Sequence, residues 1–329
     1  MQTSSFFLGS CTTLFSVFSL LPSLAAAASS TTSSTYTLAT SYAGSTFFNG
    51  FNFYSDADPT EGFVTYVNQS TALNTGLISA SDGKPVYIGV DHTNKYNGRV
   101  GYSGINGVGR PSVRVESKAT FNHALIIADL TNMPGGVCGT WPALWTLGDG
   151  EWPYSGEIDI IEGVNTNTQT LTSLHTGGQC NVPNAVARAG ETGTFKSSNC
   201  TYSENNDDGC SVSDGDSQSY GLGFNANNGG VYVMERTSTS VKTWSFRRGA
   251  IPSDITAGTP NPANWGNPYA NFAGNCNFDA QFVNHRIILD TTFCGGWAGS
   301  VWSDSCAAST GVKSCSVYVG NNPSAFKNM

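Results

Sequence analysis

Residues 156–163 read Gly-Glu-Ile-Asp-Ile-Ile-Glu-Gly and place three acids within six positions. The isoleucines are β-branched and apolar, so this segment predicts a strand. Side chains alternate along a strand, so Glu157 and Asp159 share one face, whereas Glu162 would point to the opposite face and into a core. Burying an unpaired carboxylate is costly. We therefore predict a β-bulge at Ile160-Ile161, because one extra residue returns Glu162 to the face of the other two acids.

This arrangement of acids predicts glycoside hydrolysis. Three carboxylates on one face repel one another, so at least one keeps its proton at neutral pH. Hydrolysis needs one ionised carboxylate to attack the anomeric carbon and a second, with a raised pKa, to protonate the leaving oxygen. Glu157 and Glu162 can lean together to roughly 5–5.5 Å, the separation found in retaining enzymes, with Asp159 between them. Isoleucines facing a core argue against a merely exposed acidic strand, but a calcium site stays open as an alternative.

Tryptophans near the acids strengthen this interpretation. Trp145 ends the segment 139–145, Trp152 precedes Pro153, and Trp297 follows two glycines far downstream. Sugar rings present apolar C–H faces that stack on aromatic planes, and aromatic side chains combine an apolar body with a polar edge. A tryptophan in a loop rich in glycine and proline is poorly explained as core, although any single one of them can still be a core residue.

The rest of the sequence has the pattern of an all-β protein. Short runs rich in Val, Ile, Tyr, Phe and Thr alternate with turn residues, and no helical periodicity is sustained over 12 residues. Examples of these runs are residues 63–67, 86–90, 112–116, 124–128, 230–236 and 241–246. Their spacing predicts a two-sheet antiparallel sandwich, in which the last two runs form a hairpin. Residues 181–219 predict a long polar loop that a disulfide at Cys200 or Cys210 staples.

Composition excludes some partners. Only 12% of the residues are charged, against the usual share of roughly 25%, and the net charge is −8. A protein that binds nucleic acid needs clustered Lys and Arg, so we expect no nucleic-acid partner. A neutral polysaccharide meets no such objection.

The N-terminus predicts secretion. Residues 1–28 combine an apolar run at 14–21 with small residues at 23–28, the pattern of a secretory signal peptide cleaved between Ala25 and Ala28. The segment before the run lacks Lys and Arg, so a membrane anchor is the alternative; the run is too short and too rich in serine for a span of roughly 20 residues. Residues 29–35 predict a short Ser/Thr-rich leader and residues 36–329 a single catalytic domain, with no later membrane segment.

The cysteines agree with an oxidising compartment. The chain has nine, of which Cys11 lies within the predicted signal peptide. The other eight predict up to four disulfides with the pairing left open: Cys138, Cys180, Cys200, Cys210, Cys276, Cys294, Cys306 and Cys315. No CxxC pair occurs and the four histidines are scattered, so we expect no zinc. We also expect no metal and no cofactor, with a structural calcium as the alternative that stays open. Asn68 and Asn199 begin glycosylation sequons.

Nearly the whole mature chain resembles glycoside hydrolase family 16, in particular its fungal endo-1,3(4)-β-glucanases, the laminarinases. The matching motifs are residues 139–143, 156–165, 174–176, 234–236, 292–299 and 322–326. The resemblance implies a two-sheet antiparallel β-jelly roll with an open substrate cleft. It also implies Glu157 as the nucleophile, Glu162 as the general acid/base and Asp159 as the assisting carboxylate. The cleft-lining positions that it implies are Trp145, Trp152, His175 and Trp297.

Two of these implications have alternatives or departures. His175 would form a hydrogen bond to the sugar or to the side of the site that holds the nucleophile. Alternatively, it is a polar side chain near the cleft whose hydrogen bonds are satisfied within the protein. Relatives continue past the motif at 322–326 with a further strand that carries aromatic residues, so we expect the sheet here to lack that strand.

We expect a secreted, monomeric, retaining endo-β-glucanase in the extracellular space or cell wall. Its substrate would be β-1,3-glucan, as polysaccharide or oligosaccharide, and also mixed-linkage β-1,3/1,4-glucan. A cell-wall transglycosylase of the same fold would share both glutamates and is the alternative. A non-catalytic binding module is disfavoured because all three acids are present.

Overall fold

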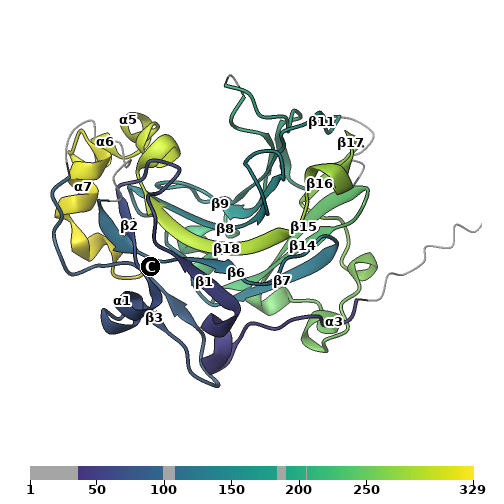
Figure 1. The fold of residues 1–329 in the computed structure, drawn as a ribbon, viewed down its shortest axis with the longest axis horizontal. Coiled ribbons are helices and arrows are strands. Elements are labelled where there is room, and N and C mark those ends of the chain that lie inside the picture. The colour runs from purple at the N-terminus through teal and green to yellow at the C-terminus, as the bar shows by residue number, and fades with distance from the viewer. Residues whose placement is uncertain (1–35, 99–107, 184–189, 205) are drawn as a thin grey trace, which may run out of the picture. The chain divides into compact units, whose positions relative to one another are not determined.

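The computed structural model describes residues 36–98, 108–183, 190–204 and 206–329, drawn in colour in Figure 1. The predicted signal peptide, the predicted leader and Cys11 lie outside the described residues. The chain divides into two units, Met1–Ser34 and Thr35–Met329, and every element below belongs to the second unit.

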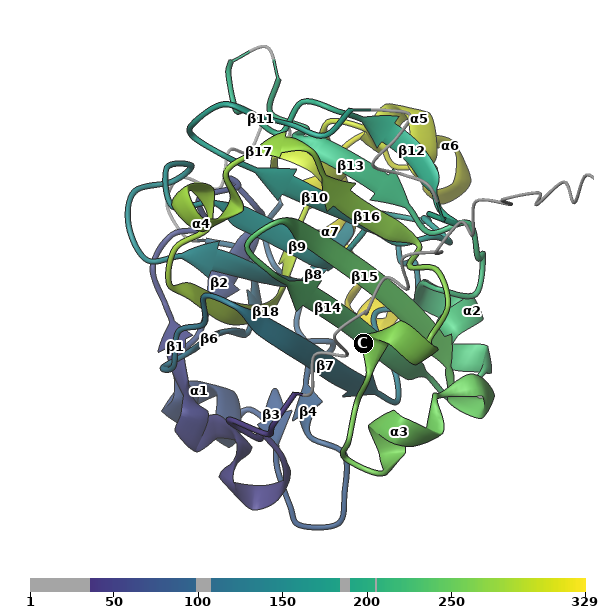
Figure 2. The ribbon, with the colours of Figure 1, turned by 90° about the vertical axis from the view of Figure 1, so that its right-hand side faces the viewer.

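Two antiparallel sheets form the body of this unit. The larger sheet has the strand order β1 (Phe51–Tyr54), β6 (Arg114–Ser117), β18 (His285–Phe293), β8 (Thr140–Gly148), β9 (Glu157–Glu162), β10 (Leu171–His175), β13 (Cys210–Ser213) and β12 (Thr194–Ser197). The smaller sheet has the order β16 (Ala270–Ala273), β15 (Ser240–Arg247), β14 (Gly230–Arg236) and β7 (Ala124–Leu130). Figure 2 looks onto the smaller sheet, with the larger one behind it.

The main core lies between the two sheets. Ile158, Leu174 and Val212 come from the larger sheet, and Tyr232 and Phe272 come from the smaller one. All five are almost completely buried, because each strand turns alternate side chains toward the opposite sheet. The fold is thus the predicted all-β antiparallel sandwich.

Shorter elements surround the sheets. The additional strand pairs are β2 (Val64–Tyr66) with β5 (Arg110–Ser112), β3 (Ile78–Ser79) with β4 (Tyr87–Ile88), and β11 (Cys180–Asn181) with β17 (Asn275–Cys276). The α-helices are α1 (Gln69–Asn74), α2 (Gly221–Ala226), α3 (Ser253–Thr256), α4 (Phe278–Gln281), α5 (Trp302–Ser305), α6 (Ala307–Thr310) and α7 (Cys315–Asn321). Four 3-10 helices and one π-helix complete the set: η1 (Gly44–Gly50), η2 (Arg248–Ala250), η3 (Pro262–Asn264), η5 (Pro323–Phe326) and the π-helix η4 (Gly295–Gly299).

The hairpin predicted from residues 230–236 and 241–246 is confirmed as β14 and β15. The run at 124–128 is confirmed within β7, and those at 63–67 and 86–90 shrink to β2 and β4. The strand predicted at 112–116 is confirmed in part: two strands cover this run, because the chain changes partners there. β5 pairs with β2 in parallel, whereas β6, beginning at Arg114, joins the larger sheet.

The long loop predicted at 181–219 is wrong in part. β12 and β13 lie within it and form one edge of the larger sheet. The four residues of β13 are all buried, but three of them are Cys or Ser, so the sequence lacks the apolar alternation that would predict a strand. The predicted staple is confirmed, since Cys200 and Cys210 bond to each other.

All eight cysteines predicted to be oxidised form disulfides. The pairs are Cys138–Cys306, Cys180–Cys276, Cys200–Cys210 and Cys294–Cys315. Two of the bonds, Cys138–Cys306 and Cys294–Cys315, tie the C-terminal helices to the end of the larger sheet, where the labels α5, α6 and α7 gather in Figure 1.

The C-terminal helices have a core of their own. Phe326 and Met329 are buried there against Phe293, the last residue of β18. β18 itself is a central strand, because it pairs with β6 on one side and β8 on the other. The expectation that a further strand is missing stays a prediction.

The main core predicts the cost of one truncation. Leu174→Ala removes a side chain that is 0% exposed between the sheets, so we expect the free energy of unfolding to fall by about 2–5 kcal/mol. Urea denaturation followed by tryptophan fluorescence measures this loss. Leu222→Ala is the matched control, because Leu222 is 73% exposed and its truncation should change stability by about 0.5 kcal/mol or less. Equal losses in the two variants would contradict this account of the core.

Candidate active site

The predicted bulge lies in β9. Against β8, Leu144 pairs with Ile161 but the next residue, Trp145, pairs with Asp159, so Ile160 is the extra residue. The register with β10 shifts at the same place. Ile160 and Ile161 are both buried in the core. The bulge is therefore confirmed, and it returns Glu162 to the face that carries Glu157 and Asp159.

That outer face is continued by β8, whose burial alternates strictly along its length. The even-numbered positions, such as Leu144, point into the core. The odd-numbered positions share the outer face and lie opposite the acids: Ala143 opposite Glu162, Trp145 opposite Asp159 and Leu147 opposite Glu157. Trp141 lies two positions before Ala143, on the same face. The carboxylates and two indole rings therefore occupy one surface of the larger sheet.

Each of the two glutamates accepts one indole N–H. Nε1 of Trp141 donates to Oε1 of Glu162 at 2.8 Å, and Nε1 of Trp152 donates to Oε2 of Glu157. Trp152 stands in the segment between β8 and β9 and is 40% exposed. These two hydrogen bonds fix the carboxylates in separate orientations, and each favours the ionised form of its acceptor.

His175 and Asp159 form an ion pair beneath Glu157. Nε2 of His175 lies 3.4 Å from Oδ2 of Asp159, and His175 is the β10 residue opposite Glu157. Burial lowers the pKa of His175, but Asp159, Glu157 and Glu162 outweigh it and raise that pKa to about 9. The imidazole is therefore a cation at neutral pH, and it partly neutralises the acids.

Burial and mutual repulsion shift both glutamates toward the protonated form. Burial and then Asp159 raise the pKa of Glu157 to about 8, while His175 and the Trp152 N–H act to lower it. Burial and then Asp159 raise the pKa of Glu162 well above its ordinary range, against the lowering effect of the Trp141 N–H. The charge of His175 lowers the pKa of Glu157 more than the Trp152 N–H does. For Glu162 the order is reversed, because the Trp141 N–H lowers its pKa more than His175 does. The two glutamates therefore differ in which group opposes the rise of their pKa most strongly.

Some of these residues carry atoms that are potential metal ligands. Glu157, Asp159 and His175 are the one group of potential metal ligands within the described ranges, and their ligand atoms lie within 4.8 Å of one another. All three already act on one another through charge, because the imidazolium supplies the positive charge that a cation would bring. The predicted absence of a metal stays a prediction.

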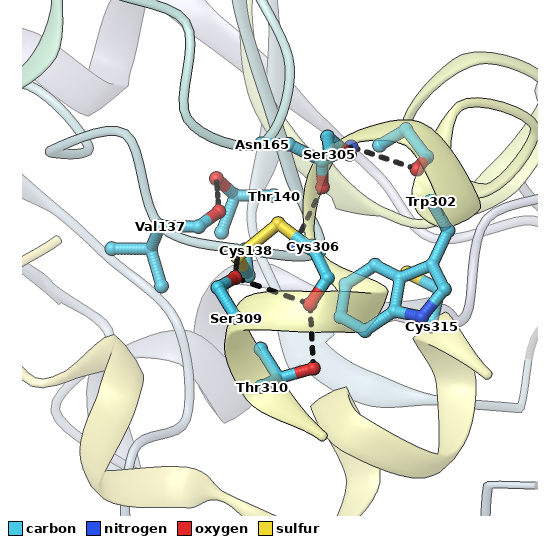
Figure 3. The surroundings of a disulfide bond; sticks show 12 residues. Val137, Cys138, Thr140, Asn165, Trp302, Ser305, Cys306, Ser309, Thr310 and Cys315 are labelled. Atoms are coloured by element: carbon cyan, nitrogen blue, oxygen red, sulfur yellow. Dashed lines mark hydrogen bonds between the residues drawn. A yellow bond between two sulfur atoms is a disulfide. The ribbon is translucent and has the colours of Figure 1, made fainter. Parts of the chain in front are cut away.

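Trp297 approaches the site from η4. Its ring meets that of Trp141 edge to face, with centroids 5.7 Å apart at 89°. Buried Asn165 anchors η4: its Oδ1 accepts from the Gly139 N–H at 2.8 Å, and its Nδ2 donates to the Ala298 carbonyl at 3.0 Å. Figure 3 shows Asn165 next to Ser305, to which it also donates, close to the Cys138–Cys306 disulfide. The position of Trp297 thus depends on contacts that span most of the chain.

A second acidic site, on Asp290, lies on the same face. Trp145 Nε1 donates to Asp290 Oδ1 at 2.8 Å, and the Tyr66 hydroxyl donates to Oδ2 at 2.7 Å. The Arg114 guanidinium stacks between Trp145, 4.9 Å from its ring centroid, and Tyr54 at 4.4 Å. Burial raises the pKa of Asp290 to about 6, although Arg114, Tyr66 and Trp145 oppose the shift. This network holds the Trp145 ring in one orientation.

All seven residues named in the sequence analysis as catalytic or substrate-binding lie on or beside this face, and their roles stay predictions. Sequence reasoning gave no role to Asp290 or Arg114, and it left Trp141 out of the cleft-lining positions. For Trp141 a signal existed, because it precedes Trp145 by four positions and therefore shares its face on a strand. For Asp290 there was none, since only the pairing of β18 with β8 brings it next to Trp145.

The chain can now be compared with known proteins. Residues 51–329 match the family model of the XgeA-like catalytic domain of glycoside hydrolase family 16. The chain therefore belongs to glycoside hydrolase family 16. A probable endo-1,3(4)-β-glucanase of Aspergillus flavus is 46% identical over 298 residues, which cover 89% of this chain and 43% of that protein. The chain thus spans about half the length of the curated relatives it matches.

Solved structures agree. Laminarinase 16A from Phanerochaete chrysosporium, whose structure holds β-glucans in both donor and acceptor sites, is 41% identical with a TM-score of 0.81, covering 90% of this chain and 96% of that one. An elongating family 16 β-1,3-glucosyltransferase is 43% identical with a TM-score of 0.80, covering 89% and 95%. The jelly roll predicted from the sequence is thereby confirmed.

Within the described ranges, no helix has both the length and the apolar character needed to cross a membrane. Both predicted glycosylation sites are exposed. Asn68 is the N-cap of α1, accepting from the Thr71 N–H at 2.9 Å, and Asn199 directly precedes Cys200. Whether either asparagine carries a glycan stays a prediction.

The raised pKa of Glu157 predicts how stability depends on pH. A carboxyl that holds its proton more tightly when folded stabilises the fold below its unfolded pKa of about 4.3 and loses that contribution as pH rises through about 8. Glu157→Gln stays neutral throughout, so we expect it to be more stable than the parent at pH 8 by about 1 kcal/mol or more, the equivalent of one pKa unit. This advantage should shrink toward pH 4.5.

Thermal unfolding of both proteins from pH 4.5 to 8 measures the effect. Glu151→Gln serves as the control, because Glu151 is an exposed glutamate that water solvates in the folded and unfolded states alike. An advantage of Glu157→Gln that stays constant with pH would contradict the assignment.

Proposed function

We propose that this chain is a secreted, retaining endo-β-glucanase that hydrolyses β-1,3-glucan and also accepts mixed-linkage β-1,3/1,4-glucan. The observation that carries the proposal is the pair Glu157 and Glu162, brought to one face by the bulge and each given its own indole N–H donor. Two carboxyls with separate surroundings on a surface rich in tryptophan match what glycoside hydrolysis needs.

The reaction would proceed in two displacements. Ionised Glu157 attacks the anomeric carbon, and Glu162 gives its proton to the departing glycosidic oxygen, so a glycosyl ester forms as the chain is cut. Glu162, now ionised, then takes a proton from water, whose oxygen attacks the anomeric carbon and releases Glu157. The pair therefore holds one proton before the first step and again after the second, which is the state that the raised pKa of Glu162 favours.

His175 and Asp159 would support the first displacement. The imidazolium lies opposite Glu157 and favours its ionised form, whereas the Asp159 charge keeps the imidazole protonated. Asp159 also raises the pKa of both glutamates, so the proton remains available to Glu162. Asp159 is thus proposed as an assisting group that sets charge and does not itself react.

The aromatic rings would bind the glucan along the outer face. Trp145 is held by Arg114 and Asp290, and Trp297 is held edge to face against Trp141. Rings fixed in this way lose little conformational entropy on binding, so they suit stacking against sugar C–H faces. The similar laminarinase that holds β-glucans in donor and acceptor sites supports this substrate class.

A transglycosylase remains the second candidate. The observation that favours it is the similarity to an elongating β-1,3-glucosyltransferase, at a TM-score of 0.80. Both activities share the glycosyl ester on Glu157 and differ in whether water or a sugar hydroxyl takes it. A binding module without catalysis is disfavoured, since Glu157, Asp159 and Glu162 are all in place.

The remaining proposals concern the setting of the enzyme. Four disulfides and two exposed sequons support secretion to the extracellular space or cell wall. We also propose that the chain acts as a monomer and without a cofactor.

Incubating the purified protein with laminarin and with lichenan tests the function. We expect reducing sugar to appear first as the β-anomer, which proton NMR detects. The rate of its release should fall at least about a thousandfold in Glu157→Gln because the nucleophile is lost. The activity of Glu162→Gln should fall less on an aryl β-glucoside, because the leaving group of that substrate needs no proton. Products longer than the substrate would favour the transglycosylase, and equal turnover by Glu157→Gln would refute the assignment of the nucleophile.

A further inference from the structure

Tyr202 packs against the tryptophan that binds Glu157. The rings of Tyr202 and Trp152 meet edge to face with centroids 4.5 Å apart at 64°. The indole N–H of Trp152 is in turn the donor to Glu157. The next aromatic neighbour of Trp152 is His175, farther away at 6.4 Å. Trp152 is itself 40% exposed, so Tyr202 supplies much of the packing that fixes its ring.

The main chain around Tyr202 is held firmly. Its N–H donates to the carbonyl of Thr176, the residue after His175, at 2.9 Å. The Thr176 N–H donates to the Cys200 carbonyl at 2.8 Å, and the fully buried Cys200–Cys210 disulfide closes the segment into a loop. We call residues 200–204 and 206–210 the stapled loop. It lies between β12 and β13 in the chain.

The stapled loop also touches the second group that favours ionised Glu157. Gly209, with φ +63°, lies so close to His175 that a Cβ there would be 2.9 Å from Nδ1 of the ring. A single disulfide-bonded loop therefore contacts both Trp152 and His175. It contributes no charged group of its own to Glu157 among the contacts described.

We propose that Tyr202 is a positioning residue for the nucleophile: its ring, fixed by the stapled loop, keeps the Trp152 N–H on Glu157. This inference rests on the proposed function for its catalytic consequence. The charged groups that face Glu157 are Asp159 and Glu162 on its own strand and His175 on β10, while β8 presents the apolar Leu147. Trp152 is thus the one uncharged donor in this set, and Tyr202 acts only through it.

Removing the ring should loosen this donor. In Tyr202→Ala we expect kcat on laminarin to fall about tenfold with KM changed less than about twofold, because the donor acts on the nucleophile and not on the sugar. The acidic limb of the kcat/KM profile should move up by about half a pH unit or more, since Glu157 loses a donor that favours its anion. Tyr202→Phe should behave as the parent, because the contact is made through the ring.

A double-mutant cycle separates positioning from a general structural effect. Trp152→Phe keeps an aromatic ring but removes the N–H, so Tyr202→Ala added to it should have little further effect on the acidic limb. Tyr154→Ala is the matched control, since Tyr154 is an exposed tyrosine in the same segment as Trp152 and should leave the limb in place. Additive shifts in the cycle, or an equal shift in the control, would overturn the proposal. So would a higher KM with an unmoved limb, which would make Tyr202 a sugar contact.

A titration without substrate distinguishes this proposal from the proposed function. Indole fluorescence of the parent is measured against pH and compared with that of Trp152→Phe and Glu157→Gln. A transition that the parent shows and both variants lack reports protonation of Glu157 next to Trp152. We expect its midpoint to rise in Tyr202→Ala and not in Tyr202→Phe; an unchanged midpoint would overturn the role of Tyr202. If the parent released no sugar from any β-glucan, the proposed function would fail while this titration still decided the role of Tyr202.

Discussion

A strand that helps to build a core must turn every charged side chain away from that core, and strict alternation cannot place Glu157 and Glu162 together. Glu162 follows Glu157 by five positions, an odd number, so one of the two would be buried among Ile158 and Leu174. The extra residue Ile160 removes this conflict. Because Ile160 and Ile161 are both buried, the bulge costs the core no apolar contact while it gives the outer face its second glutamate.

The price of this arrangement is electrostatic. Three carboxylates lie on adjoining positions of one strand, partly or fully out of water, and no arginine or lysine contacts them among the described residues. The compensation consists of one imidazolium and two indole N–H groups. These are enough to hold the acids in place without making them all fully ionised, so the pKa values of Glu157 and Glu162 stay raised. A site fully neutralised by arginine would be more stable, and it would hold no proton to donate.

The sequence could predict what depends on neighbours in the chain. Acid spacing, β-branched residues between the acids and the cost of a buried carboxylate together indicated the strand, its bulge and the outward face of Glu162. The β14–β15 hairpin followed from the same local reasoning. The C-terminal helices did not, because each spans only four to seven residues and is held by Cys138–Cys306 and Cys294–Cys315 rather than by its own periodicity. Pairings between distant strands, such as the one that brings Asp290 to Trp145, have no local signal at all.

The two glutamates are supported by different parts of the chain. Trp141, the donor to Glu162, packs against Trp297, which belongs to the C-terminal region held by Cys138–Cys306 and Cys294–Cys315. Trp152, the donor to Glu157, packs against Tyr202 on the stapled loop. Each acid thus has an indole donor and each donor has a second ring from a separately cross-linked segment. Changes in one segment can therefore alter the surroundings of one carboxyl while β9 stays the same.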